Sequence, residues 1–204
     1  SRDYYGRWKA QHYFTVKSFD DILVSPIEKS KGLLEVYAVS DRLKQTSGTL
    51  TVRVLKLTGG TVKQVVKKVN VPANTSTPIW TGDMDELLGG LSRTDVVVNV
   101  NYKDKGGREY TNNCFLAKQK DMRYPEARIK KEIIPVEGGY EVILSSDVFA
   151  RGVFVSIEGD TDNFVSDNYM DLLPGEPVKV RVNTSLASSP FTANLKVVSF
   201  SEMY

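Results

Sequence analysis

The chain has 204 residues, of which 41% are hydrophobic and 25% are charged, and its formal net charge is +2. This composition is typical of a globular protein and excludes disorder along the whole chain, while the length allows one large domain or two small ones. No apolar run approaches the roughly 20 residues that a membrane-spanning helix requires. A single cysteine and a single histidine exclude a disulfide framework and a metal cluster built on thiolates or imidazoles.

Familiar catalytic patterns are absent from the sequence. His12 is the only candidate for a histidine base, and Cys114 lies far from it in the chain. The sequence contains no G-x-S-x-G, P-loop or G-x-G-x-x-G pattern. A lone histidine among aromatic residues favours packing over catalysis. We therefore predict no catalytic, cofactor-binding or metal-binding residue in this chain.

Charge is distributed unevenly along the chain. Residues 1–125 have an excess of seven basic side chains, and residues 126–204 have an excess of five acidic ones. The change falls at the polar stretch 118–125, which ends in Pro125 and has the composition of a linker. This pattern predicts two domains that meet near residue 120.

The first predicted element in the chain is a helix within residues 1–20. Its apolar residues form one narrow stripe at helical spacing, namely Tyr5, Trp8, His12, Val16 and Phe19. Tyr4 and Phe14 lie off this stripe, so we expect one face to pack on the first domain and the other to expose aromatics. We also expect His12 to pack beside Trp8. Because the chain begins at Ser1 rather than at a methionine, we expect it to be a processed product or an excised piece of a longer protein.

From residue 32 onward the pattern is that of β-strands. Short β-branched runs alternate with turn residues at the spacing typical of β-sandwiches. The predicted strands are residues 34–38, 50–55, 62–71, 96–102, 110–116, 129–136, 140–144, 153–157, 169–173, 178–182 and 195–200. Gly-Gly pairs at 59–60, 106–107 and 138–139 predict tight turns, and residues 83–90 predict one short helical turn that ends in glycine. On the residues alone, 166–182 form a hairpin around a Pro174-Gly175 turn.

Several polar and aromatic features have both a functional and a structural interpretation, and we favour the structural one for each. Asp160-Thr161-Asp162-Asn163 has oxygen ligands that suit calcium, but it lacks the glycine and the distal glutamate of a calcium loop. Four lysines could bind an acidic polymer or protect the edge of a strand from pairing with another chain, namely Lys56, Lys63, Lys67 and Lys68. Trp80 could stack on a sugar ring or pack in the core of a sandwich, and Cys114 could fill a buried apolar position. Asn74 and Asn183 begin glycosylation sequons.

Two stretches resemble a known family. Residues 1–14, SRDYYGRWKAQHYF, resemble the segment that ends the catalytic barrel in β-mannosidases of glycoside hydrolase family 2. Residues 164–176, FVSDNYMDLLPGE, resemble a stretch in the last immunoglobulin-like domain of that family. The resemblance implies an all-β fold with two tandem immunoglobulin-like sandwiches after one short amphipathic N-terminal helix. Residues 1–20 would be the remnant of the last barrel helix, 21–120 a mannosidase-type, carbohydrate-binding-like sandwich, and 121–204 the C-terminal sandwich.

The same resemblance implies a non-catalytic role. Members of the family use two glutamates at the ends of barrel strands, and the acid/base glutamate follows an asparagine. This chain contains no Asn-Glu pair and too few strand–helix units for a barrel. We therefore expect a C-terminal segment that braces the catalytic barrel of a retaining exo-β-mannosidase through Tyr5, Trp8 and His12. The expected partners are that barrel and mannose-containing glycans, with no nucleic acid and no membrane; homodimerisation stays open.

Two other functions stay open at this point. A carbohydrate-binding module would need a row of exposed, coplanar aromatics, and the equivalent segment of an exo-β-glucosaminidase would share the same architecture. A free-standing adhesin-like tandem would have no reason to carry the aromatic stripe. The expected location follows the source of the protein: periplasmic or secreted in bacteria, lysosomal in animals.

Overall fold

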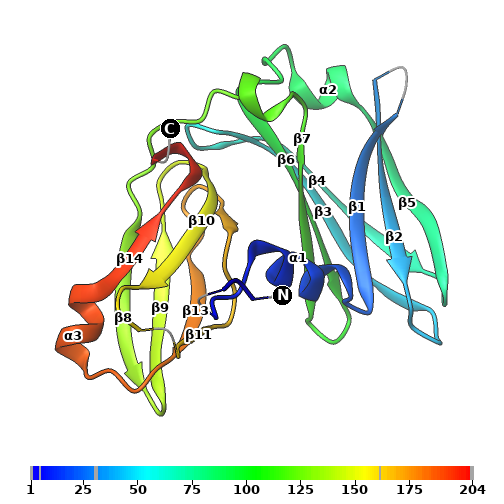
Figure 1. Ribbon diagram of the computed structural model, residues 1–204. Coiled ribbons are helices and arrows are strands. Elements are labelled where there is room, and N and C mark those ends of the chain that lie inside the picture. Colours follow the sequence, from blue (N-terminus) through cyan, green and yellow to red (C-terminus); the bar gives the residue numbers. More distant parts are fainter. Residues whose placement is uncertain (1, 5, 30–31, 161, 203–204) are drawn as a thin grey trace. The chain divides into compact units, whose positions relative to one another are not determined.

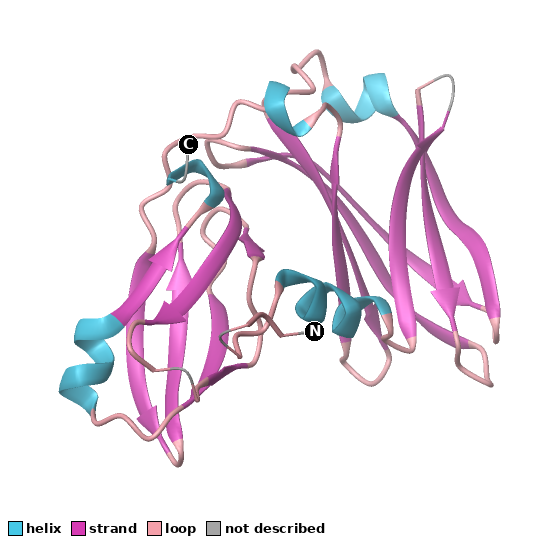
Figure 2. Ribbon diagram, viewed as in Figure 1, coloured by secondary structure: helices cyan, strands magenta, loops and turns pink. Residues whose placement is uncertain are grey.

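The computed structural model describes residues 2–4, 6–29, 32–160 and 162–202. Most of these residues are in β-strands and few are in helices (Figures 1 and 2), which confirms the predicted fold class. The chain divides into two compact units. The first unit contains residues 17–56 and 60–123, and the second contains residues 1–16, 57–59 and 124–204, so the division passes through helix α1 (Ala10–Ser18).

The first unit is a sandwich of two antiparallel sheets. Its strands are β1 (Ile22–Lys29), β2 (Leu33–Ser40), β3 (Thr46–Lys56), β4 (Thr61–Val71), β5 (Thr75–Asp83), β6 (Val96–Asp104) and β7 (Glu109–Phe115). The sheet orders are β1-β2-β5 and β4-β3-β6-β7 (Figure 1). Alternate residues of both sheets point inward and form the core, as in Leu34 and Val36 of β2 and Val98 and Val100 of β6.

A short helix closes one end of this sandwich. Helix α2 (Met84–Leu88) begins at Asp83, whose side chain accepts a hydrogen bond from the Glu86 N–H at 2.9 Å. It ends at Gly89, which adopts the left-handed conformation (φ 57°) that glycine tolerates. The acidic start and glycine end predicted for residues 83–90 are confirmed.

The second unit is also built from two antiparallel sheets. Its elements are β8 (Lys130–Val136), β9 (Gly139–Ser145), β10 (Ala150–Ile157), β11 (Phe164–Val165), β12 (Met170–Leu172), β13 (Val178–Asn183), α3 (Ser188–Asn194), β14 (Leu195–Val198) and the 3-10 helix η2 (Phe200–Glu202). A further 3-10 helix, η1 (Gln119–Asp121), lies at the end of the first unit. The sheet orders are β11-β13-β9-β8 and β12-β10-β14. A separate core fills the space between them, and Phe191 of α3 stacks on Tyr140 with ring centroids 3.9 Å apart.

Two strands that the sequence analysis missed are the edges of the sheet β1-β2-β5. β1 contains Pro26 and β5 contains Pro78, and each proline interrupts the apolar alternation that identifies a strand. Proline lacks the N–H that a central strand needs, so it is confined to edges such as these. The interruptions therefore mark edge strands rather than loops.

The predicted hairpin over residues 166–182 is wrong. The turn itself is present, because the Glu176 N–H donates to the Leu173 carbonyl at 3.1 Å and Gly175 has a φ of 75°. However, β12 pairs with β10 in one sheet, whereas β13 pairs with β9 and β11 in the other. The Pro174-Gly175 turn therefore carries the chain from one layer of the sandwich to the other.

Candidate functional site

The N-terminal segment differs from the predicted continuous helix. Helix α1 begins only at Ala10, so Trp8 precedes it, and Tyr5 lies outside the described residues. Before the helix the chain folds back, with an isolated β-bridge between Arg2 and Trp8 and a 2.7 Å ion pair between Arg7 and Asp3. The predicted stripe of Tyr5, Trp8, His12, Val16 and Phe19 is therefore not one helical face.

Aromatic rings connect this segment to the second sandwich. Trp8 stacks on His12 with ring centroids 4.1 Å apart, as predicted, and His12 meets the edge of Tyr13 at 5.2 Å. Tyr13 lies 6.0 Å from Tyr169, which in turn lies 5.0 Å from Phe154 of β10. Because Tyr13 is only 5% exposed, it is the residue that anchors α1. We expected this helix to pack on the first sandwich, but its buried residue packs on the second.

Asn168 is the polar centre of the same region. Its side chain is buried, accepts a hydrogen bond from the Val155 N–H at 2.8 Å and donates one to the Val155 carbonyl at 2.8 Å. It thus takes the place of a paired strand beside β10. Burial raises the pKa of Tyr13, and a hydrogen bond with Asn168 opposes that rise. Sequence analysis placed Asn168 only within the predicted hairpin over residues 166–182 and missed its contacts with β10 and α1.

The residue after Asn168 has an unusual backbone conformation. Tyr169 has a φ of 57°, which is uncommon for a residue with a side chain. Its N–H donates to the Asn168 side-chain oxygen at 3.0 Å. This conformation lets the chain regain its pairing with β10 at Met170, opposite Val153.

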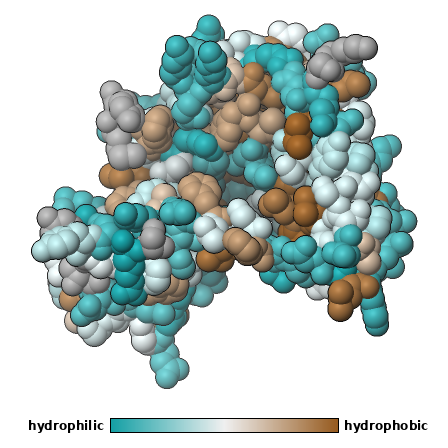
Figure 3. Space-filling view, turned by 45° about the vertical axis from the view of Figure 1, so that its right-hand side comes forward, coloured by the Kyte–Doolittle hydropathy of each residue, from teal (hydrophilic) through white to brown (hydrophobic). Residues whose placement is uncertain are grey.

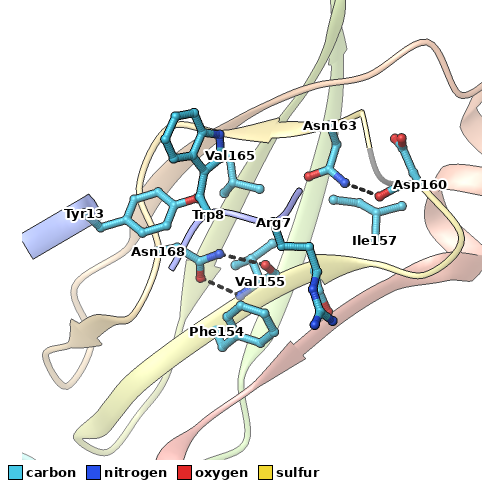
Figure 4. A pocket seen from close by; sticks show the side chains of 11 residues that line it. Arg7, Trp8, Tyr13, Phe154, Val155, Ile157, Asp160, Asn163, Val165 and Asn168 are labelled. Atoms are coloured by element: carbon cyan, nitrogen blue, oxygen red, sulfur yellow. Dashed lines mark hydrogen bonds between the residues drawn. The ribbon is translucent and has the colours of Figure 1, made fainter. Parts of the chain in front are cut away.

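A small cavity lies at this junction within the second unit (Figure 4). Its lining includes Arg7, Trp8, Tyr13, residues 154–157 of β10, Asp160, Asn163, Val165 and Asn168. Its volume is about 70 Å³. Ligand pockets usually measure roughly 300–1,000 Å³. The cavity is therefore too small to hold a sugar ring.

Apolar side chains at the N-terminal segment are left in water. Tyr4 is 95% exposed, Phe14 is 54% exposed and Val16 is 61% exposed. On the face drawn in Figure 3, hydrophobic residues form several small groups separated by hydrophilic ones. We call Tyr4, Phe14 and Val16 the exposed N-terminal patch. They differ from the predicted contact residues Trp8 and His12, whose rings pack on each other.

The candidate sugar-binding and calcium-binding residues make contacts that stabilise the fold. Trp80 packs against the core of the first sandwich, and its ring lies where a side chain at Gly82 would be. Asp160 accepts hydrogen bonds from the Thr184 hydroxyl and from the Asp162 N–H, so its carboxylate oxygens hold the loop together.

Lys63 and Cys114 also make contacts that stabilise the first sandwich. Lys63 belongs to β4, an edge strand, and pairs with Glu86 at 2.9 Å. Burial raises the pKa of the Cys114 thiol, which packs against the core of the first sandwich. The thiol is therefore held in its neutral, unreactive form at neutral pH.

The carboxyl groups show no sign of a general acid among the described residues. A glycosidase acid needs a raised pKa, but each carboxyl group with a shifted pKa, namely Asp21, Asp104 or Glu109, has a lowered one. In the same residues, no group of three or more His, Cys, Asp or Glu side chains is placed to hold a metal ion. Nor do these residues include a helix that is long and apolar enough to span a membrane.

Comparison with known proteins gives matches along most of the chain. Residues 32–121 match the family model of the mannosidase Ig/CBM-like domain, and residues 124–203 match that of an Ig-fold domain. Beta-mannosidase A of Neosartorya fischeri is 35% identical over 187 residues, which cover 85% of this chain and 20% of that protein. Beta-mannosidase A of Aspergillus fumigatus is 24% identical over 195 residues, 87% of this chain and 21% of that protein.

Solved structures show the same fold. The β-D-mannosidase from Dictyoglomus thermophilum superposes with a TM-score of 0.82 at 22% identity, over 98% of this chain and 24% of that one. The exo-chitosanase CsxA of Amycolatopsis orientalis superposes with a TM-score of 0.61 at 15% identity, over 97% of this chain and 28% of that one.

The fold defines a tandem of two immunoglobulin-like sandwiches with an N-terminal helix. The chain belongs to the C-terminal immunoglobulin-like region of glycoside hydrolase family 2 mannosidases. It spans about a fifth of the length of the curated relatives that it matches.

Proposed function

We propose that this chain is the non-catalytic C-terminal segment of a β-mannosidase that releases terminal β-D-mannose, and that it braces the catalytic barrel of that enzyme. We further propose sandwiches at residues 21–120 and 121–204, with residues 1–20 as the connection to the barrel. The observation that carries the proposal is the N-terminal segment. It is anchored on the second sandwich by Tyr13, yet it leaves Tyr4, Phe14 and Val16 exposed.

The exposed N-terminal patch is the surface that we assign to the barrel. Large apolar side chains in water cost about 25 cal/mol per Å² relative to burial, and exposed patches of this kind mark interaction sites. A surface that connects to a larger body explains this exposure. In this proposal the stacked rings of Trp8 and His12 stabilise the N-terminal segment and do not contact the barrel.

Activity measurements test the first half of the proposal. The isolated chain should not hydrolyse an aryl β-mannoside, because the carboxyl groups with a shifted pKa among its described residues all have a lowered one, which does not suit a group that must protonate the leaving oxygen. The full-length protein that contains this chain should hydrolyse it. An inactive full-length protein, or activity of the isolated chain that survives repurification, would show that the assigned activity is wrong.

A substitution in the patch tests the bracing role. Phe14→Glu should leave the melting temperature of the isolated chain nearly unchanged, because Phe14 is already more than half exposed. In the full-length protein the same change should cost about 2 kcal/mol or more, because a charge would enter an apolar contact. Thr15→Glu, at an exposed neighbouring position, is the matched control and should be tolerated in both. Equal responses to the two substitutions in the full-length protein would contradict the bracing role.

A further inference from the structure

Two identical tripeptides in this chain have the sequence that accepts an N-linked glycan. They are Asn74-Thr75-Ser76 and Asn183-Thr184-Ser185, and the proposed function uses neither. Such a glycan is attached to the asparagine, and modified tripeptides of this kind lie in surface loops of secreted proteins. Both asparagines are exposed, so exposure alone does not distinguish them. Because the two tripeptides are the same, a difference between them has to come from their surroundings.

Asn74 lies in a loop. It belongs to the connection 72–74 between β4 and β5, which are edge strands of different sheets. Its φ of 44° is in the left-handed region, which asparagine adopts more readily than most residues. The Asn74 backbone N–H donates to the Arg42 carbonyl at 2.9 Å, which holds the loop in place. Its side-chain amide, in contrast, has no hydrogen bond to any part of the chain that the structure describes.

The same loop leaves space for a sugar. Its other residues, Pro72 and Ala73, are exposed, and so is Ser76 at the end of the tripeptide. Strand β5 begins at Thr75, which pairs with Ser40 of β2. A glycan on the Asn74 side chain therefore extends into water from the ends of two strands. It displaces neither a packed side chain nor a paired strand.

Asn183 lies in a sheet instead. It is the last residue of β13, and it pairs with Phe164 of β11 on one side and with Gly139 of β9 on the other. Gly139 is so near that a Cβ atom built on it would lie 3.1 Å from the Asn183 Cα. The Arg181 Nε donates to the Asn183 side-chain oxygen at 2.9 Å. The backbone and the side chain of Asn183 are therefore both held by the fold.

We propose that Asn74, rather than Asn183, carries an N-linked glycan when this chain is made in a eukaryotic secretory pathway. In the transfer, the Asn74 side-chain nitrogen forms a bond to the anomeric carbon of an oligosaccharide that is carried on a lipid pyrophosphate. The bond from that carbon to the pyrophosphate oxygen breaks, the lipid pyrophosphate leaves, and the amide nitrogen loses one proton. No group is oxidised or reduced, and the proposal does not depend on the assigned enzymatic activity.

Competition between glycan transfer and folding explains the choice of asparagine. The Asn74 loop stays open to a transferase after the first sandwich has folded, because its side-chain amide faces water. The segment around Asn183 is open only until β13 pairs with β9 and β11. The Thr184 hydroxyl then donates to the Asp160 carboxylate at 2.6 Å, which fixes the second tripeptide further. Reopening a strand that is paired on both sides costs free energy, so we expect occupancy at Asn74 to be higher by about tenfold or more.

Mass spectrometry of the secreted chain tests the proposal. The whole chain is expressed behind a cleavable signal peptide in a eukaryotic cell line and treated with peptide-N-glycosidase in heavy-oxygen water, which converts each glycosylated asparagine into a labelled aspartate. We expect the label at Asn74 in most molecules, about tenfold or more above that at Asn183. Ser76→Ala removes the first tripeptide but keeps Asn74, and it should abolish the label there. The matched control Ser185→Ala should leave the label at Asn74 unchanged.

A conservative variant separates the loss of the tripeptide from a disturbed fold. Ser76→Thr keeps the hydroxyl that the tripeptide requires, so it should keep the glycan on Asn74. An unlabelled Asn74 in a chain secreted together with a glycosylated reporter protein would overturn the proposal. So would a label at Asn183 that equals or exceeds the label at Asn74.

Discussion

Replacing Arg42 by methionine should lower the free energy of unfolding of the first sandwich by about 3 kcal/mol. Its guanidinium donates to Asp21 at 2.7 Å, to Asp104 at 2.9 Å and to the Tyr110 hydroxyl at 2.6 Å. The Asp104 side chain is only 7% exposed, so methionine would leave a nearly buried carboxylate without its main partner. Urea unfolding followed by tryptophan fluorescence measures the loss.

A second arginine serves as the matched control. Arg123 pairs with Asp95 at 3.4 Å, and both side chains are largely exposed. Exposed ion pairs contribute about 0–1 kcal/mol, so Arg123→Met should have little effect on unfolding. If the two substitutions cost the same, the burial of the Arg42 cluster is not what stabilises this end of the sandwich.

Acid should act on the same cluster. Burial alone would raise the pKa of Asp21, but hydrogen bonds from Arg42 and Tyr110 outweigh it and lower the pKa to about 2. The pKa of Asp104 is lowered by Arg42 in the same way, against burial. A lowered folded-state pKa contributes stability that is present above the unfolded value of about 3.9 and is lost as the pH falls towards 2. Arg42→Met removes that downward shift, so the difference in free energy of unfolding between the parent chain and Arg42→Met should shrink as the pH falls from about 4 towards 2.

The residues of this cluster show what the sequence could predict and what it could not. The strands β2 and β3 follow from alternating apolar residues, and the sharp turns between strands follow from glycine pairs. Nothing in local pattern, however, connects Asp21 with Arg42, or Arg42 with Asp104, which is 62 positions further along the chain. Those contacts arise only when the two sheets pack, so sequence periodicity contains no signal for them.

The N-terminal segment shows the same limit. Its aromatics and their family resemblance were visible in the sequence, and the packing of His12 on Trp8 was predicted from them. The helical stripe was not correct, because the Asp3–Arg7 ion pair and the Arg2–Trp8 bridge hold residues 2–4 and 6–8 in a turn. Asn168 could have been suspected from its position before an apolar strand, but its partner Val155 lies on a strand 13 residues away. The contacts that anchor the N-terminal segment could therefore not be predicted from the sequence and are visible only in the structure.

Asn168→Ala should detach the N-terminal segment from the second sandwich and lower the free energy of unfolding by about 3 kcal/mol. The substitution leaves both the N–H and the carbonyl of Val155 without their side-chain partner in a buried position. It also removes the hydrogen bond between Asn168 and Tyr13 and the acceptor for the Tyr169 N–H, which supports a left-handed backbone. All of these hydrogen bonds lie where α1 packs on the second sandwich, so their combined loss should weaken the packing of α1.

Hydrogen exchange distinguishes this local effect from general loosening of the protein. In Asn168→Ala, amide protection should fall most in residues 10–16 and in β10, while β6 of the first sandwich keeps its protection. Asn163→Ala is the matched control, because Asn163 lines the same cavity but its side-chain amide donates to the Asp160 carbonyl within its own loop. It should leave residues 10–16 protected. Uniform loss of protection in both variants, or unchanged protection of α1 in Asn168→Ala, would show that Asn168 does not anchor the N-terminal segment.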